Sequence, residues 1–264
     1  MSIQATILEN QAKEKIEAED YQGAYELLQE AIAVDDSDNI HLFEQAIDIA
    51  HDQLGLFEDV VNYATVLLLQ DESRDVVRMQ RAWANYDLGK TEEAFADFQY
   101  VIDGSNSDKD ILYARSGRGL CYYSLNQYEE AVSDLEDALV VYDLWAIGFA
   151  HLGWAYYFLK QYETARVKLD KAIELSKNTY YFAHGGRGLV NYELREYDVA
   201  IDDLTIGLED YTTWHQGFAT RGWCYLDIGF YQNQMELALQ DFDKALELTK
   251  GNYTYASAGR GLVN

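Results

Sequence analysis

Apolar and small residues recur with helical spacing along the whole chain. A small residue returns every 34 to 38 residues, at Ala24, Val60, Ala94, Ala131, Ala165, Ala200 and Ala238. Each is followed four residues later by an apolar residue, and three residues after that by another small or apolar one. Because spacings of four and three place side chains on one face of an α-helix, the pattern predicts one helix in every unit.

A second, preceding helix is predicted in the same units. About twelve residues upstream of the first small residue lies another one, at Ala82, Gly119, Gly153 and Gly188 in successive units. A short turn such as LNQYEEA joins the two segments, and a period of this length is typical of helical hairpins. We expect one all-α domain over residues 1–264, with hairpins at about 5–38, 41–74, 75–108, 112–145, 146–179, 181–213 and 215–252 and a partial one at 254–264.

The hairpin resembles the tetratricopeptide repeat. Residues 149–175 read FAHLGWAYYFLKQYETARVKLDKAIEL, in which Gly153, Tyr156, Ala165, Leu169 and Ala172 match the family pattern in order. The resemblance covers essentially the whole chain. It implies a right-handed superhelix (solenoid) of about seven α-α hairpins plus a partial eighth.

Several features depart from the family pattern. The chain has no proline, whereas family repeats end in one, and Asp48 stands where a small residue is expected. The hairpin at 215–252 has about four extra residues in GFYQNQMELA (229–238), which we expect to lengthen its loop. Because YASAGRGLVN (255–264) repeats an interior first helix, we expect the native protein to continue beyond Asn264.

The glycine-rich segment HGGRGLVN (184–191) is interpreted as a packing motif. Dinucleotide-binding and phosphate-binding loops need G-x-G-x-x-G after a strand or G-x-x-x-x-G-K-[ST], and this segment supplies neither. In the family, the corresponding position is where the first helix lies against the second. We therefore expect close helix approach to be the reason for a glycine there.

Four arginines each stand directly before the small residue of a predicted first helix, and each has an aspartate 16 or 20 residues later. They form the pairs Arg81 and Asp97, Arg118 and Asp134, Arg187 and Asp203, and Arg221 and Asp241. The hairpin at 146–179 has Leu152 and Lys168 at these positions and so loses both members together. We expect ion pairs between the two helices, since an unpaired, partly buried charge is unfavourable. The alternative is a row of arginines that binds an acidic ligand.

The charge limits the classes of partner. The net charge is −26, of which residues 1–75 carry −15, and phosphate binding relies on Lys and Arg. We therefore expect no nucleic acid partner, and a neutral or basic protein or peptide instead. The alternative role of the acidic residues is to keep the molecule soluble. Without an apolar span or a signal peptide, we expect no membrane insertion and a cytoplasmic location.

No catalytic motif is recognisable. The five histidines fall in different units, and we expect His184 and His215 to lie on helix surfaces. The two cysteines are too few for a zinc cluster and are expected to be small core residues. The sequence therefore predicts a protein that is not an enzyme and that has no cofactor or metal.

The family resemblance implies a concave groove lined by the first helices. The corresponding positions are Trp83, Tyr86, Tyr123, Trp154, Tyr157, Phe158, Phe182, Leu189, Tyr192 and Trp223. Aromatic side chains suit peptide recognition, and the alternative is that these rings fill the core between helices. The family's groove for acidic C-termini needs Lys, Asn and Arg at positions that here hold Ser, Leu, Ala, Trp and Gly.

The predicted function is that of a scaffold or adaptor that binds a peptide or a partner segment in this groove. Two alternatives remain open at this point. One is a regulatory sensor that responds to a small peptide, and the other is a chaperone for a secreted client. In both, any effector domain would lie outside this chain.

Overall fold

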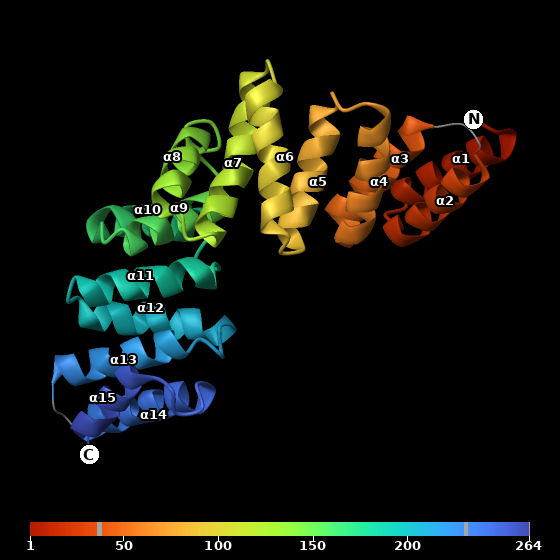
Figure 1. Cartoon of the computed structure of the whole chain (residues 1–264). Helices are drawn as coiled ribbons and strands as arrows, with labels where there is room; N and C mark the ends of the chain where they lie inside the picture. The colour runs from red at the N-terminus through yellow and green to blue at the C-terminus, as the bar shows by residue number, and fades with distance from the viewer. Residues whose placement is uncertain (36–38, 230–231, 264) are drawn as a thin grey trace. The chain divides into compact units, whose positions relative to one another are not determined.

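Helices make up the regular structure of residues 1–35, 39–229 and 232–263, which are described by a computed structural model (Figure 1). The α-helices are α1 (Ile3–Glu17), α2 (Tyr21–Val34), α3 (Ile40–Ile49), α4 (Phe57–Gln70), α5 (Asp75–Asp87), α6 (Thr91–Gly104), α7 (Asp108–Ser124), α8 (Tyr128–Leu139), α9 (Ala146–Phe158), α10 (Tyr162–Leu175), α11 (Tyr181–Glu193), α12 (Tyr197–Asp210), α13 (His215–Ile228), α14 (Gln232–Leu248) and α15 (Thr254–Val263). A π-helical segment, η1 (Ala50–Leu54), continues α3.

The chain forms two compact units, Met1–Leu125 with α1 to α7 and Asn126–Asn264 with α8 to α15. Within each unit, consecutive helices pack as hairpins, for example α1 with α2 and α11 with α12 (Figure 1). The prediction of an all-α fold built from repeated helical hairpins is confirmed. The grouping of all hairpins into one domain stays a prediction.

Small residues let the two helices of a hairpin approach closely. Ala165 and Ala200, which begin the second-helix pattern in their hairpins, are fully buried. A Cβ atom added to Gly153 would lie 2.5 Å from Cγ of Leu169, and one added to Gly188 would lie 2.7 Å from Cγ of Leu204. Such distances are shorter than van der Waals contact, so a side chain at either glycine would push the second helix away.

The chain reverses at residues whose backbone is in the left-handed conformation, and it does so without proline. The amide of Gln161 donates to the carbonyl of Tyr156 at 2.9 Å, while Lys160, with φ of 60°, donates to Tyr157 at 2.9 Å. This pair of bonds is a Schellman motif, which satisfies the last carbonyls of the helix. After α10, the second helix of its hairpin, Asn178 has φ of 64° and its amide donates to the carbonyl of Ile173 at 3.0 Å. The end of this hairpin is therefore also formed without proline.

The hairpin at 41–74 differs from the expected register. Asp48 is exposed, whereas Ile47 and Ala50 are buried. The cause is η1, because a π-helical turn accommodates an extra residue and rotates the residues around it relative to a regular α-helix. The segment then ends at Gly55, which adopts φ of 64°. The assignment of Asp48 to the buried small-residue position was therefore wrong.

The extra residues of the hairpin at 215–252 do not all lengthen its loop. Helix α14 begins at Gln232 and has 17 residues, compared with 14 in α10 and α12. Most of GFYQNQMELA is thus helical, and the expectation of a longer loop was wrong for this part. Phe230 and Tyr231 of the same segment lie outside the described residues, as do residues 36–38.

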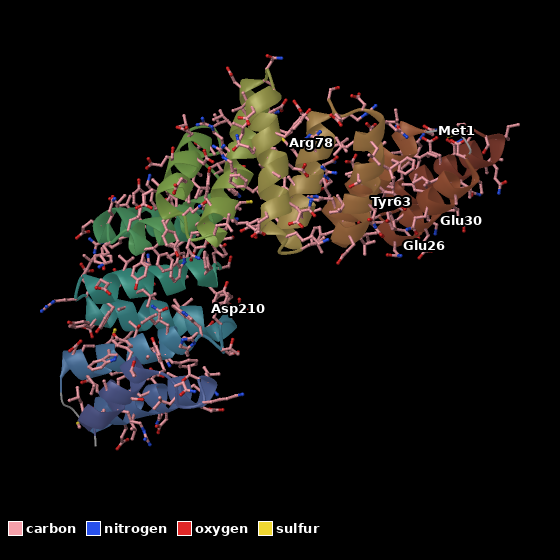
Figure 2. The ribbon with its side chains drawn as sticks, viewed as in Figure 1. Met1, Glu26, Glu30, Tyr63, Arg78 and Asp210 are labelled. Atoms are coloured by element: carbon pink, nitrogen blue, oxygen red, sulfur yellow. The ribbon has the colours of Figure 1, made fainter. Side chains whose placement is uncertain are left out.

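Acidic side chains of the N-terminal unit lie on outward helix faces. Glu26 and Glu30 are exposed on α2 (Figure 2). Others bind neighbouring helices: Tyr25 Oη donates to Asp59 at 2.8 Å, and Arg74 donates to Glu44 at 3.0 Å. None of the helices in the described ranges is long and apolar enough to span a bilayer.

Candidate functional site

Asp203 lies at the centre of a buried polar cluster between α11 and α12. Arg187 donates Nε and Nη2 to its two carboxylate oxygens at 2.8 and 2.7 Å. Nδ1 of His184 and Nδ2 of Asn191 each lie 3.0 Å from the same carboxylate, which can only accept hydrogen bonds. Burial alone would raise the pKa of Asp203, but the bonds from His184 and Arg187 outweigh it and lower the pKa below its ordinary value.

The same pair of hydrogen bonds from one arginine to one aspartate occurs in two other hairpins. Arg81 donates Nε and Nη2 to Asp97 at 2.8 and 2.7 Å, and Arg221 donates the same atoms to Asp241 at 2.8 Å each. The remaining Nη1 groups of Arg81 and Arg221 donate to threonine hydroxyls at 3.2 and 3.0 Å. These guanidinium groups are therefore occupied within the protein, which disfavours the alternative of an acidic ligand.

The fourth expected pair, Arg118 and Asp134, has its members in different compact units and stays a prediction. Within the N-terminal unit, Arg118 donates Nη1 to Oε1 of Gln99 at 2.6 Å, and its guanidinium lies over the ring of Tyr122.

His184 was expected on a helix surface, and that expectation was wrong. Its side chain is buried at 3% exposure because Asp203 holds it between the helices. A sequence signal exists, since His184 lies three residues before Arg187, as Arg78 lies three residues before Arg81. Arg78 in turn contacts Asp97, with Nη1 3.4 Å from the carboxylate. In these two hairpins, the position three residues before the arginine therefore supplies a second donor to the aspartate, whereas the hairpin at 215–252 has Phe218 there.

The contribution of Asp203 to stability is expected to depend on pH. Its pKa is lowered in the folded state, so the stabilisation is fully present above the ordinary value of 3.8 and is lost as pH falls through the lower folded value. We expect the difference in unfolding free energy between wild type and Asp203→Ala to shrink as the pH is lowered below about 4. Urea unfolding at a series of pH values measures it, and a difference that stays constant down to the lowest pH at which the protein folds would contradict it.

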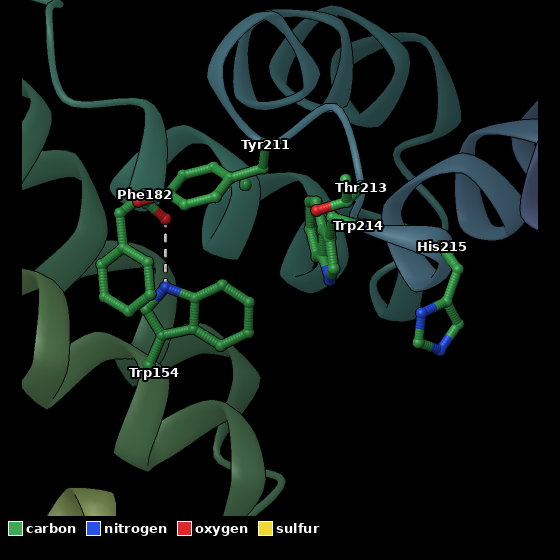
Figure 3. A pocket seen from close by; sticks show the side chains of 7 residues that line it. Trp154, Phe182, Tyr211, Thr213, Trp214 and His215 are labelled. Carbon is green, nitrogen blue, oxygen red and sulfur yellow. Dashed lines mark hydrogen bonds between the residues drawn. The ribbon is translucent and has the colours of Figure 1, made fainter. Parts of the chain in front are cut away.

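An aromatic pocket opens between α9, α11 and the start of α13. It has a volume of about 330 Å³ and is lined by Trp154, Phe182, Gly185, Tyr211, Thr213, Trp214 and His215 (Figure 3). Trp154 donates Nε1 to the carbonyl of Phe182 at 3.0 Å, and the rings of these two residues stack at 5.3 Å. Trp214 meets Trp154 edge to face at 6.2 Å. The indole N–H is thereby satisfied while the ring faces remain apolar walls.

Two glycines leave the space that the ring of Trp214 occupies in this pocket. Trp214 is the N-cap of α13, and a Cβ on Gly217 would lie 2.2 Å from its Cε3 atom. A Cβ on Gly185 would lie 3.1 Å from its Cζ3 atom. The ring therefore folds over the first turn of its own helix and against α11. Trp145 covers Gly148 in the same way. The tryptophan and glycine three residues apart in WAIG (145–148) and WHQG (214–217) therefore have a local packing cause.

A second hollow adjoins the same helices nearer their C-terminal ends. Here called the tyrosine hollow, it has a volume of about 240 Å³ and is lined by Tyr157, Leu189, Tyr192, Glu193, Gln216, Thr220, Tyr253 and Tyr255. Tyr255 Oη donates to Tyr192 Oη at 3.1 Å. Burial raises the pKa of each of the four tyrosines, so their hydroxyls are neutral near pH 7.

The structure brings five of the ten expected groove residues to these two sites. Trp154 and Phe182 line the aromatic pocket, whereas Tyr157, Leu189 and Tyr192 line the tyrosine hollow. Trp154 and Leu189 are also buried, at 8% and 1% exposure. They therefore serve the core and the site together. Tyr211, Trp214, His215, Tyr253 and Tyr255 were not among the expected groove residues.

The other expected residues of the C-terminal unit lie outside both sites. Phe158 is 42% exposed and stacks on Tyr128 at 4.5 Å. Trp223 packs edge to face against Phe242 at 5.7 Å and donates Nε1 to the carbonyl of Tyr255 at 3.3 Å. Trp223 therefore joins first and second helices in its hairpin.

The remaining expected residues belong to the N-terminal unit. Trp83 packs edge to face against Phe98 at 5.2 Å, and its buried Nε1 has no hydrogen-bond partner within the described ranges. Tyr86 lies beside Trp83 and shares a hydrogen bond with Ser124, and Tyr123 is half-buried. Trp83 thus fills space between helices of its hairpin.

Thiols and metal-binding groups are sparse. Cys121 and Cys224 are buried, and burial raises the pKa of each thiol to about 12. Across the described ranges, no group of three or more His, Cys, Asp or Glu side chains is placed to hold a metal ion.

Sequence comparisons place the repeats in a family. Two sequence models described as tetratricopeptide repeat match residues 79–146 and 148–179. Heat shock protein STI1 of Saccharomyces cerevisiae is 30% identical over 96 residues. The matched part is 36% of this chain and 16% of that protein, so the chain corresponds to a small part of this relative.

Solved structures share the fold over longer stretches. A tetratricopeptide repeat protein from Parabacteroides merdae covers 99% of this chain and is itself covered to 99%, with 20% identity and a TM-score of 0.62. YrrB, described as a TPR protein with an unusual peptide-binding site, covers 75% of this chain and is covered to 97%, with 21% identity and a TM-score of 0.56. PilW, described as a type IV pilus biogenesis factor, covers 80% and is covered to 96%, with 14% identity and a TM-score of 0.63.

Proposed function

The chain is a tetratricopeptide repeat protein, and we propose that it is a protein-interaction scaffold whose C-terminal unit binds an extended peptide segment of a partner. The observation that carries this proposal is the pair of aromatic sites on neighbouring first helices. Trp154 and Tyr157, one turn apart on α9, line the aromatic pocket and the tyrosine hollow respectively. Helices α11 and α13 likewise contribute to both. A segment laid along these helices would reach the two sites in turn.

The size and chemistry of the sites suit side chains of a peptide. Volumes of about 330 and 240 Å³ lie at or below the lower end of the range for small-molecule pockets. Aromatic walls bury a large area with few rotatable bonds, which favours binding of partner side chains. Neutral tyrosine hydroxyls and the Gln216 amide can bond the backbone groups of an extended chain, which has no internal partners for them.

A neutral or basic partner is favoured. The two sites have no lysine or arginine among their described lining residues, and the chain carries a net charge of −26. An acidic segment would be repelled, whereas a basic one would be attracted over the range set by ionic strength. YrrB, which shares the fold, is described as having a peptide-binding site, which is consistent with this use of the fold.

The proposal predicts that peptide affinity depends on Tyr211. Phage-displayed random dodecapeptides are selected on the whole chain, and a synthetic, fluorescent copy of an enriched peptide is titrated by anisotropy. Tyr211 is 39% exposed and lines the aromatic pocket, so Tyr211→Ala should weaken binding roughly tenfold while leaving the fold intact. Tyr100→Ala removes a tyrosine of similar exposure, 44%, from α6 and should change affinity less than about twofold.

Two results would contradict the proposal. One is a selection that enriches no peptide. The other is an enriched peptide whose affinity for Tyr211→Ala and for Tyr100→Ala is the same.

A further inference from the structure

The tyrosine hollow has the chemistry of a cation-binding site. Four tyrosine rings, Tyr157, Tyr192, Tyr253 and Tyr255, contribute to its lining together with Glu193, the one acidic residue among its described lining residues. Aromatic ring faces attract cations, and a carboxylate supplies a counter-charge. No described lining residue is a lysine or arginine that would occupy Glu193 from within the hollow.

The carboxylate of Glu193 retains the capacity to bind a ligand. Its residue is exposed, and it shares a hydrogen bond with the hydroxyl of Tyr162 while lying close enough to Tyr157 to raise the pKa of that phenol. An ionised carboxylate has about four acceptor sites, so one tyrosine leaves others unused. A second carboxylate, Asp227, acts on Tyr192 from the neighbouring helix α13. Two carboxylates, one on α11 and one on α13, therefore lie near the rings of the hollow.

The tyrosine hydroxyls offer acceptor sites to a cation, and the carboxylate of Glu193 disfavours an anion at the same place. Tyr255 donates its hydroxyl hydrogen to Tyr192, so the oxygen of Tyr255 keeps its acceptor sites. An ammonium or guanidinium group can donate to that oxygen and to Glu193 together. An acidic side chain would instead meet the carboxylate of Glu193 without a neutralising lysine or arginine in the lining.

The adjoining aromatic pocket differs in polarity. Its walls are the rings of Trp154, Phe182, Tyr211 and Trp214, and His215 at its rim is the one titratable side chain other than Tyr211 among its described lining residues. The N–H of Trp154 is already bonded to a backbone carbonyl. This pocket therefore suits a large apolar side chain.

We infer, resting on the proposed function, that the tyrosine hollow is the subsite for a lysine or arginine side chain of the bound peptide. The aromatic pocket takes a large apolar side chain of the same peptide. Glu193 is the counter-charge and the specificity-determining residue of the cationic subsite.

The spacing of the two sites fixes the spacing of the two side chains. From the pocket to the hollow, the lining moves from Trp154 to Tyr157 on α9 and from Gly185 to Leu189 and Glu193 on α11. It also moves from Trp214, the N-cap of α13, to Thr220. These steps of three to eight residues correspond to about 5 to 12 Å along a helix. An extended peptide advances about 3.3 Å per residue, so the apolar and basic residues should be two to four positions apart.

The composition of the selected dodecapeptides tests the subsite directly. We expect the enriched sequences to share a Lys or Arg two to four positions from a Trp, Phe, Leu or Met. Enriched peptides that lack a basic residue, or that carry Asp or Glu in its place, would overturn the inference while the proposed function stands. A selection that enriches nothing would overturn the proposed function and this inference together.

A coupling experiment assigns the charge effect to Glu193. One enriched peptide is synthesised with its basic residue and, as a matched analogue, with norleucine at that position. For the wild-type chain, the analogue should bind roughly tenfold more weakly, and the affinity of the basic peptide should fall with added NaCl. For Glu193→Gln, which keeps the shape, the two peptides should differ by less than about twofold.

Glu130→Gln is the matched control. It removes the same charge from an exposed position on α8, which lines neither site, so the tenfold preference should persist. If Glu193→Gln keeps the preference, or if Glu130→Gln abolishes it equally, general attraction to an acidic protein explains the binding and the subsite assignment is overturned.

Discussion

Asp203→Ala is expected to lower the free energy of unfolding of the C-terminal unit by about 3–5 kcal/mol, the largest single effect that this fold predicts. The carboxylate is 2% exposed and accepts from Arg187 twice and from His184 and Asn191 once each. Its removal leaves His184 and Asn191 without this acceptor between α11 and α12, and it leaves Arg187 with Asp170 alone, to which its Nη1 donates at 2.6 Å. Urea denaturation followed by circular dichroism measures the loss.

Asp202→Ala is the control for this prediction. Asp202 is the preceding residue on α12 and is exposed, so its removal should change stability by less than about 0.5 kcal/mol. Equal effects for Asp202→Ala and Asp203→Ala would mean that the buried cluster does not hold the hairpin together.

Gly207→Ala is expected to destabilise the protein by about 1–3 kcal/mol, because the new methyl group would meet backbone atoms. A Cβ on Gly207 would lie 2.9 Å from Cα and 3.0 Å from N of Gly185 on α11. Backbone cannot rotate away as a side chain can, so α11 and α12 must separate. Gly185 also seats Trp214, and a shift of α11 should therefore weaken peptide binding as well.

Gly104→Ala provides a matched comparison at the C-terminal end of α6. A Cβ there has no described atom within 4 Å, and alanine is the better helix former by about 1 kcal/mol. This variant should be neutral or slightly stabilised in the same denaturation experiment. If both glycine variants behaved alike, close approach of helices would not be the reason for the glycine at position 207.

The sequence predicts the hairpins well because a repeated pattern reports helix faces many times over. The separation of 16 residues between Arg81 and Asp97 recurs between Arg187 and Asp203. The hairpin at 146–179 lacks both members of the pair. Those observations constrain which side chains meet across two helices. The role of His184 was missed because a histidine stands where the other hairpin has Arg78, so the two residues share a position in the sequence but not a residue type.

The site is less predictable because much of it lies outside the periodic pattern. Tyr211 and Thr213 belong to the connection between α12 and α13, and Trp214 is an N-cap rather than a residue of a helix face. Helical spacing says nothing about such positions. The register of α3 was missed for a related reason, because the sequence gives no sign of the π-helical turn at Ala50–Leu54.

Photo-crosslinking of a selected peptide tests the central claim most directly. Benzoylphenylalanine replaces the large apolar residue of the peptide, the complex with the whole chain is irradiated, and the attachment site is located by mass spectrometry. Binding along the first helices predicts attachment at the lining of the aromatic pocket, at Trp154, Tyr211 or Trp214. Attachment confined to the second helices α10, α12 and α14, or to residues 1–125, would contradict it.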